Sequence, residues 1–154
     1  MIKVLFVCHG NICRSPMAEY LFKDMVKRLG LQEQFIIESA ATSAEELGSA
    51  IHRPARQMLE QHQIPYGQHC ARQVCRRDYG QFDYILIMDE RNRGNIMRIF
   101  GADPDDKVRT LLSFTAHPRD ISDPWHTPDY QKAFADIAEG CAAFLDYLQR
   151  EVKL

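Results

Sequence analysis

The sequence lacks several features that would place it in a specialised class of protein. It contains no run of about 18 apolar residues, so we expect no membrane-spanning helix and no membrane partner. Its 19 basic and 21 acidic residues nearly cancel, which excludes the basic footprint of a nucleic-acid-binding protein. It has no low-complexity tract and no repeat with a period of roughly 20–50 residues. The sequence is therefore typical of an ordinary globular protein.

The cysteines are few and odd in number. There are five of them, namely Cys8, Cys13, Cys70, Cys75 and Cys141. The apolar run at residues 2–7 is too short for a secretion signal, and no small-residue cleavage site follows it. We therefore expect a cytoplasmic protein with reduced thiols rather than a disulfide framework. Cys70 and Cys75 have no further close Cys or His pair, so no metal site is expected.

The 154 residues suffice for one domain with a complete core, and we expect a single domain over residues 1–154. Apolar runs predict strands over residues 2–7, 35–37 and 84–88, with a weaker run over 108–114. Helical spacing of apolar residues predicts helices over residues 16–29, 55–63, 91–100 and 128–148. This alternation predicts an α/β fold in three layers, with a four-stranded parallel sheet flanked by helices.

The segment after the first strand, residues 8–16 (CHGNICRSP), has the features of an anion-binding turn. Pro16 suits the first turn of a helix and Ser15 is a good N-cap residue, so the loop should run directly into a helix. Gly10 and Asn11 can adopt positive φ angles. Successive loop N–H groups and the helix N-terminus would then surround an anion beyond the carboxyl end of the strand.

Cys8 and Arg14 supply reactive groups in this loop. A thiol at a helix N-terminus beside a guanidinium group is stabilised as the thiolate, and the planar fork of Arg14 matches two oxygens of a tetrahedral oxyanion. A nucleophile, a bidentate clamp and a ring of N–H donors are the parts needed to move a phosphoryl group onto sulfur. The remaining residues of this predicted phosphate-binding loop are His9, Gly10, Asn11, Ile12, Cys13 and Ser15.

Residues 7–19 (VCHGNICRSPMAE) resemble the phosphate-binding loop of low-molecular-weight protein tyrosine phosphatases. Similarity to this family continues through residues 39–43 (SAATS), 69–73 (HCARQ), 82–89 (FDYILIMD) and 123–125 (DPW), so it covers nearly the whole chain. The resemblance implies hydrolysis of phosphotyrosine proteins or small aryl phosphates through a cysteinyl phosphate on Cys8. It implies no cofactor or metal, and a phosphate or other oxyanion as the ligand of the loop.

The Asp-Pro-Trp segment has a matching role in this family. A phenolate leaves poorly at neutral pH without a proton donor, and the resemblance implies that Asp123 is this general acid and then the base for water. Trp125 is interpreted as a wall of the cleft. The resemblance further implies that Ser43 and His69 hold the loop by hydrogen bonds, and that the hydroxyl of Ser15 stabilises the thiolate.

Two other functions are compatible with this loop. An arsenate reductase of the same fold would need further cysteines, and a non-enzymatic oxyanion-binding or redox-sensing module would need no acid. The Asp-Pro-Trp segment favours the phosphatase.

Two features concern the cysteines and the rim of the loop. The family uses the second loop thiol, here Cys13, to trap an oxidised nucleophile as a disulfide, although Cys70 and Cys75 are competing partners for Cys8. Residues 44–47 (AEEL) lack the aromatic residue common in the family, and this acidic lip is expected to repel acidic peptides.

Overall fold

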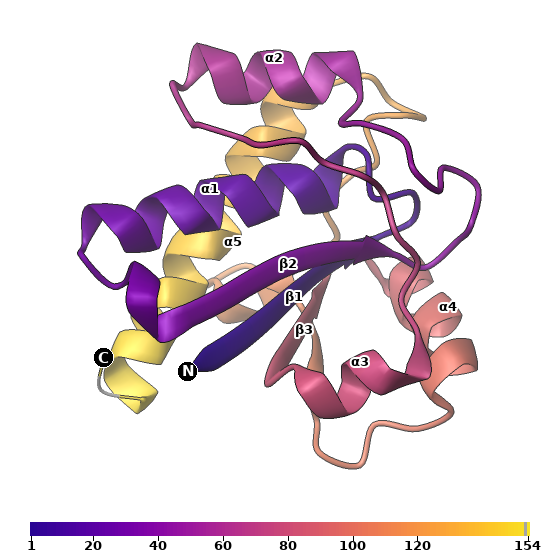
Figure 1. Ribbon diagram of the computed structural model, residues 1–154, viewed down its shortest axis with the longest axis vertical. Helices are drawn as coiled ribbons and strands as arrows, with labels where there is room; N and C mark the ends of the chain where they lie inside the picture. The colour runs from indigo at the N-terminus through magenta and orange to yellow at the C-terminus, as the bar shows by residue number, and fades with distance from the viewer. Residues whose placement is uncertain (153) are drawn as a thin grey trace.

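A four-stranded sheet, covered by helices on both faces, forms the centre of the protein in the computed structural model, which describes residues 1–152 and 154 (Figure 1). The strands lie in the order β2 (Phe35–Ala41), β1 (Ile2–Cys8), β3 (Tyr84–Ile87) and β4 (Val108–Thr110). Every neighbouring pair of strands is parallel. The α/β fold with a four-stranded parallel sheet is therefore confirmed.

The helices fall into two groups. On one face α1 (Arg14–Arg28) packs against α5 (Tyr130–Glu151), and α2 (Arg53–Gln61) contacts both of them. Near the other face lie α3 (Arg76–Gln81) and α4 (Glu90–Phe100) (Figure 1). Two short 3₁₀ helices, η1 (Gln32–Gln34) and η2 (Leu111–Phe114), precede β2 and follow β4.

The central strand β1 is buried on both faces, which explains its continuous apolar sequence. Val4 and Phe6 belong to the core beneath α1 and α5, whereas Leu5 and Val7 belong to the core on the side of α4. All four side chains are fully buried. Because side chains of a strand alternate between faces, only an unbroken apolar run satisfies both cores.

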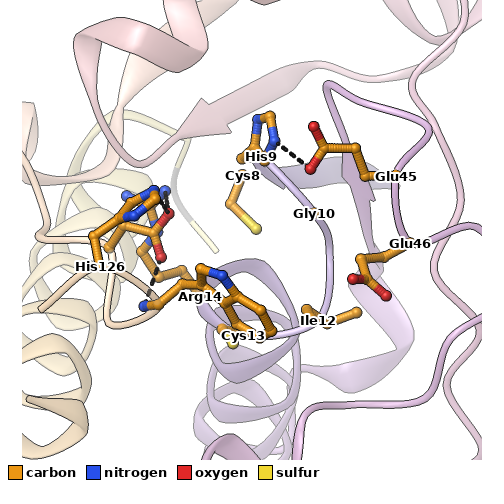
Figure 2. Close-up of a pocket in the computed structure, with 11 residues that line it drawn as sticks. Cys8, His9, Gly10, Ile12, Cys13, Arg14, Glu45, Glu46 and His126 are labelled. Atoms are coloured by element: carbon orange, nitrogen blue, oxygen red, sulfur yellow. Dashed lines mark hydrogen bonds and ion pairs between the residues drawn. The ribbon is translucent and has the colours of Figure 1, made fainter. Parts of the chain in front are cut away.

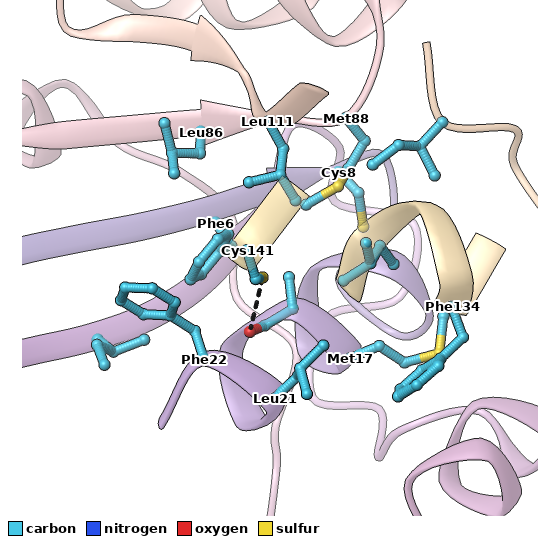
Figure 3. Close-up of a cluster of buried hydrophobic side chains, with 14 of the residues drawn as sticks. Phe6, Cys8, Met17, Leu21, Phe22, Leu86, Met88, Leu111, Phe134 and Cys141 are labelled. Atoms are coloured by element: carbon cyan, nitrogen blue, oxygen red, sulfur yellow. Dashed lines mark hydrogen bonds between the residues drawn. The ribbon is translucent and has the colours of Figure 1, made fainter. Parts of the chain in front are cut away.

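Cys8 is the last residue of β1, and its side chain belongs to the first core together with Met17, Met88 and Leu111 (Figure 3). β1 pairs with β2 on one side and β3 on the other, so the loop after Cys8 emerges from the middle of the sheet. In parallel sheets this carboxyl edge is where ligands bind.

Two parts of the predicted secondary structure were wrong. The run over residues 108–114 is a strand only to Thr110, and the rest is η2, because Leu111 and Leu112 pack their side chains against α5 instead of extending the sheet. The six-residue helix α3 was not predicted, since its sequence RRDYGQ is polar and has no apolar period. In addition, β2 continues four residues beyond Ile37 and pairs with β1 as far as Cys8.

The packing of η2 on α5 allows a matched test at two helical glycines. A Cβ atom on Gly140 in α5 would lie 2.5 Å from Cγ of the buried Leu111, whereas a Cβ on Gly94 in α4 would meet nothing within 4 Å. Gly140→Ala should unfold at a lower urea concentration than the wild type, because overpacking costs about 1–3 kcal/mol and this overlap is severe. Gly94→Ala should gain about 0.5–1 kcal/mol from helix propensity. Equal stability of the two variants would contradict the described packing.

Candidate active site

The loop between β1 and α1 is tight and is shaped by one left-handed residue. Of the two residues that the sequence allowed a positive φ, Asn11 has φ of 59° and Gly10 does not have a positive φ. The predicted N-cap role of Ser15 is wrong: α1 begins at Arg14, and Cys13 is the N-cap residue without a side-chain capping bond. Ser15 lies inside the first turn because its hydroxyl is directed toward the sulfur of Cys8, 3.1 Å away.

Hydrogen-bond donors converge on the sulfur of Cys8. The backbone N–H groups of Asn11 and Ser15 donate to Sγ at 3.3 and 3.4 Å, and the Ser15 hydroxyl is within reach of the same atom. The residue is 3% exposed. The sulfur of Cys8 therefore accepts hydrogen bonds at the floor of the loop.

A polar network behind the loop holds Asn11 and Ser15 in place. The side-chain nitrogen Nδ2 of Asn11 donates to the hydroxyls of Ser15 (2.8 Å) and Ser39 (2.9 Å). Its side-chain oxygen Oδ1 accepts from the backbone N–H of Arg72 (3.2 Å). Ser39 in turn donates to the buried carboxylate of Glu19 at 2.5 Å. Ser39 and Glu19 were not expected at the site from the sequence. A polar residue within a buried strand and an acidic residue within a buried part of a helix could have indicated a polar network.

Ser43 and His69 bind the carbonyl side of the loop. The Ser43 hydroxyl donates to the carbonyl of His9 at 2.9 Å, and Nε2 of His69 lies 2.7 Å from the carbonyl of Asn11. Contacts of this kind turn the loop carbonyls outward. The N–H groups are then free to face a bound anion, which is the arrangement of an anion-binding nest.

The guanidinium group of Arg14 is buried, at 2% exposure, and one of its two arms is fixed. Nη1 donates to Oδ2 of Asp89 and to the carbonyl of Ile121, both at 2.7 Å, while Nη2 lies 3.6 Å from Oδ2 of Asp123. Burial acts to lower the pKa of Arg14, but attraction from Cys8 and Asp89 outweighs it and the pKa is raised above its usual value. The Nη2 arm is left to face the pocket.

Asp89 is a site residue that the sequence analysis missed. It follows β3, and its Oδ1 caps helix α4 by accepting the N–H of Asn92 at 2.8 Å, so the carboxylate is held between the helix and Arg14. The available signal was the spacing of Asp89 and Asn92, which is that of a helix N-cap directly after a buried strand.

Asp123 reaches the same pocket from residues 122–129, which we call the acid loop. Its Oδ1 accepts the N–H of Trp125 at 3.0 Å, and its side chain is 24% exposed. The pocket encloses about 270 Å³, less than pockets that enclose drug-sized molecules, and suits the end of one phosphorylated side chain. It is lined by Cys8, His9, Gly10, Ile12, Cys13, Arg14, Glu45, Glu46, Asp123, Trp125 and His126 (Figure 2).

The rim of the pocket combines apolar and acidic side chains. Ile12 and Trp125 provide apolar surface, consistent with the interpretation of Trp125 as a wall. Glu45 and Glu46 lie across the pocket from His126, and Oε2 of Glu45 is 3.0 Å from Nε2 of His9 (Figure 2). The side chain of Glu45 is 70% exposed. The acidic lip expected from residues 44–47 therefore borders the pocket.

The remaining cysteines differ in their surroundings. Cys13 is buried with its sulfur 3.7 Å from the hydroxyl of Tyr130, and burial raises the pKa of its thiol to about 12. Cys141 lies in the core, and burial raises the pKa of its thiol as well. Cys70 and Cys75 are exposed and do not line the pocket.

Within residues 1–152 and 154 no group of three metal-ligating side chains comes together. In the same part of the chain, no helix is both long and apolar enough to cross a membrane.

The pocket brings together a buried cysteine, an arginine and an aspartate around an anion-binding loop, an arrangement that suits the transfer of a phosphoryl group. Residues 3–154 match the family model described as low molecular weight phosphotyrosine protein phosphatase, and the chain belongs to this family. The family predicted from the sequence is confirmed, and the protein is a phosphatase.

Known relatives cover the chain almost completely. The low molecular weight protein-tyrosine-phosphatase YfkJ of Bacillus subtilis is 35% identical over 156 residues and covers 100% of both chains. Its crystal structure has a TM-score of 0.95 and covers 98% of this chain and 96% of that chain. The human low molecular weight phosphotyrosine protein phosphatase is 36% identical over 148 residues, 93% of each chain. A Drosophila arginine phosphatase is 30% identical, with a TM-score of 0.87, over 97% and 99% of the two chains.

The contact between Asp89 and Arg14 can be tested by substitution. Asp89→Asn should lower kcat/KM for an aryl phosphate by about 10–100-fold, because a neutral amide holds the guanidinium fork less firmly and small misplacements are costly. Asp120→Asn is the matched control, since Asp120 is exposed and accepts only the N–H of Glu90 among the hydrogen bonds described. If both variants match the wild type, Asp89 does not orient Arg14.

Proposed function

We propose that this phosphatase hydrolyses phosphotyrosine in proteins and small aryl phosphates, with Cys8 as nucleophile, Arg14 as phosphate clamp and Asp123 as general acid and base. The observation that carries this proposal is the set of donors on the Cys8 sulfur, at the floor of the pocket that Arg14 and Asp123 also line. The apolar surface of Ile12 and Trp125 suits the phenyl ring of the substrate.

In the first step the thiolate of Cys8 attacks phosphorus in line with the ester oxygen. The P–S bond forms as the P–O bond breaks, and Asp123 donates its proton to the departing phenolate oxygen. The inward N–H groups of the loop and the Nη2 arm of Arg14 bind the equatorial oxygens, where charge is spread in the loose transition state.

In the second step water hydrolyses the cysteinyl phosphate. The carboxylate of Asp123 accepts a proton from water as its oxygen attacks phosphorus, and the P–S bond breaks. The released thiolate is again met by the donors from Asn11 and Ser15, so sulfur is a better leaving group here than in an apolar site. Inorganic phosphate then leaves the loop.

Replacement of the nucleophile tests the proposal directly. Cys8→Ser should lower kcat for phenyl phosphate by about 10³-fold or more, because a serine hydroxyl stays protonated in a site built for a thiolate. Cys70→Ser, at an exposed cysteine outside the pocket, is the control and should keep wild-type activity. Turnover of Cys8→Ser within about tenfold of the wild type would sink the assignment of the nucleophile.

The acid role of Asp123 predicts a dependence on the leaving group. Asp123→Asn should lower kcat by about 10²–10⁴-fold for phenyl or tyrosyl phosphate, and by much less for phosphates of acidic phenols, which depart unprotonated. The measurement is kcat across a series of aryl phosphates, with a burst experiment to establish that phosphorylation of the enzyme limits the rate. A uniform loss across the series would assign the proton to another group.

The acidic rim favours a second candidate substrate, phosphoarginine, whose guanidinium group is attracted by Glu45 and Glu46. We expect phosphotyrosine to have the higher kcat/KM, because Ile12 and Trp125 match an aromatic ring. The double variant Glu45→Gln, Glu46→Gln should increase this preference further by removing the attraction for the cation. A higher kcat/KM for phosphoarginine in the wild type would reassign the substrate.

Three further expectations from the sequence are part of the proposal. The chain acts as a single domain over residues 1–154, supported by a family match that spans residues 3–154. It works in the cytoplasm, supported by five cysteines that are free in the structure. Cys13 is the partner of Cys8 on oxidation, supported by its place in the same loop and in the lining of the same pocket.

A further inference from the structure

His52 links three parts of the molecule that meet beside the pocket. It is the N-cap residue of α2, and its backbone N–H donates to the carbonyl of Ile12 in the phosphate-binding loop at 2.8 Å. Its imidazole ring lies 4.9 Å from the ring of Trp125 in the acid loop, at an angle of 54°. The ring centre of Tyr130, at the start of α5, is 6.4 Å away.

Hydrogen bonds join the ends of the acid loop to the residue that follows β3 and to α5, whereas the backbone N–H groups in its middle bond within the loop. On the N-terminal side, Ile121 donates its N–H to the carbonyl of Met88 at 2.9 Å. At the C-terminal end, Asp129 caps α5 through Lys132. In between, the backbone N–H groups of residues 126 and 127 bond to the carbonyl of Asp123 inside the loop itself.

The carboxylate of Asp123 has one cationic neighbour from outside its loop in the part of the chain described here, Nη2 of Arg14 at 3.6 Å. On the mechanism proposed above, a bound phosphoryl group takes this same guanidinium arm. Asp123 then shares or loses its contact with Arg14 at the moment when it has to face the leaving oxygen. Another contact must hold the acid in position at that stage.

The ring contact between His52 and Trp125 meets this need. The backbone N–H of Trp125 donates to Oδ1 of Asp123 at 3.0 Å, so a contact that fixes Trp125 in the loop also fixes the carboxyl group. Trp125 is 56% exposed, which leaves its ring free to swing outward unless His52 retains it. His52 itself is held to the phosphate-binding loop through Ile12, so the contact ties the acid loop to the nucleophile's loop.

We propose that His52 is a positioning residue for the general acid: its ring packs against Trp125 and thereby holds Asp123 over the leaving group. The proposal rests on the proposed function, because it assigns His52 to the proton-transfer step of that reaction. The ring's shape, rather than its charge, carries the effect, since flat side chains pack against indole by surface contact.

The kinetic test separates positioning from a general loss of structure. His52→Ala should lower kcat about tenfold for phenyl or tyrosyl phosphate and less than about twofold for the phosphate of an acidic phenol, because only the former needs the acid. His52→Phe keeps a flat ring and should restore most of the rate. The control is His62→Ala, since His62 stacks on Phe134 at 4.2 Å and does not line the pocket.

An optical measurement tests the contact without turnover. Trp125 is the only tryptophan in the chain, so time-resolved fluorescence anisotropy reports the motion of this one indole. The amplitude of fast local motion should increase in His52→Ala and return toward the wild-type value in His52→Phe. His62→Ala is again the control, because His62 stacks on Phe134 and does not line the pocket, and it should leave the anisotropy decay close to that of the wild type.

The results that would overturn the role of His52 differ from those that would overturn the proposed function. A uniform rate loss across the leaving-group series, no restoration by His52→Phe, or unchanged indole motion in His52→Ala would overturn the role of His52 while wild-type activity stands. The proposed function itself fails if the wild type does not hydrolyse aryl phosphates or if Cys8→Ser retains its rate.

Discussion

The convergence of hydrogen-bond donors on one sulfur atom is the constraint on which the rest of the site depends. Two backbone N–H groups and one hydroxyl converge on Sγ of Cys8, and these donors exist only where the loop turns tightly enough to point inward. The left-handed Asn11 makes that turn, and its amide ties the Ser15 hydroxyl to the sheet through Ser39. The geometry of the loop therefore sets the hydrogen bonds that the sulfur of Cys8 accepts.

The fold serves this constraint through burial. Cys8 ends the central strand, whose neighbours on both sides and cores on both faces leave it no freedom to move. Arg14 is buried for the same reason and needs Asp89 and the carbonyl of Ile121 to compensate for its loss of water. Asp123, by contrast, comes from a surface loop, and its side chain is 24% exposed. The acid and base role proposed for Asp123 needs this access to water.

Sequence patterns and the family resemblance predicted the sheet, the main helices and most of the residues that line the pocket, although not His126. Burial on two faces and the loop motif both leave local signals. These patterns did not reveal Asp89, Ser39 or Glu19, whose partners are distant in sequence and become visible only when the strands are paired. The N-cap assignment of Ser15 failed for a related reason. The hydroxyl is engaged by Cys8 and Asn11, and this tertiary contact outweighs the local preference.

The central claim is that the phosphoryl group passes through a covalent bond to Cys8. Rapid acid quenching of the wild-type enzyme during turnover of an aryl phosphate, followed by peptide mapping by mass spectrometry, measures this directly. A transient phosphoryl group is expected on the peptide that contains Cys8, located on its sulfur. Phosphate found on His9 or another residue instead, or inversion of configuration at phosphorus with no phosphoenzyme, would contradict it.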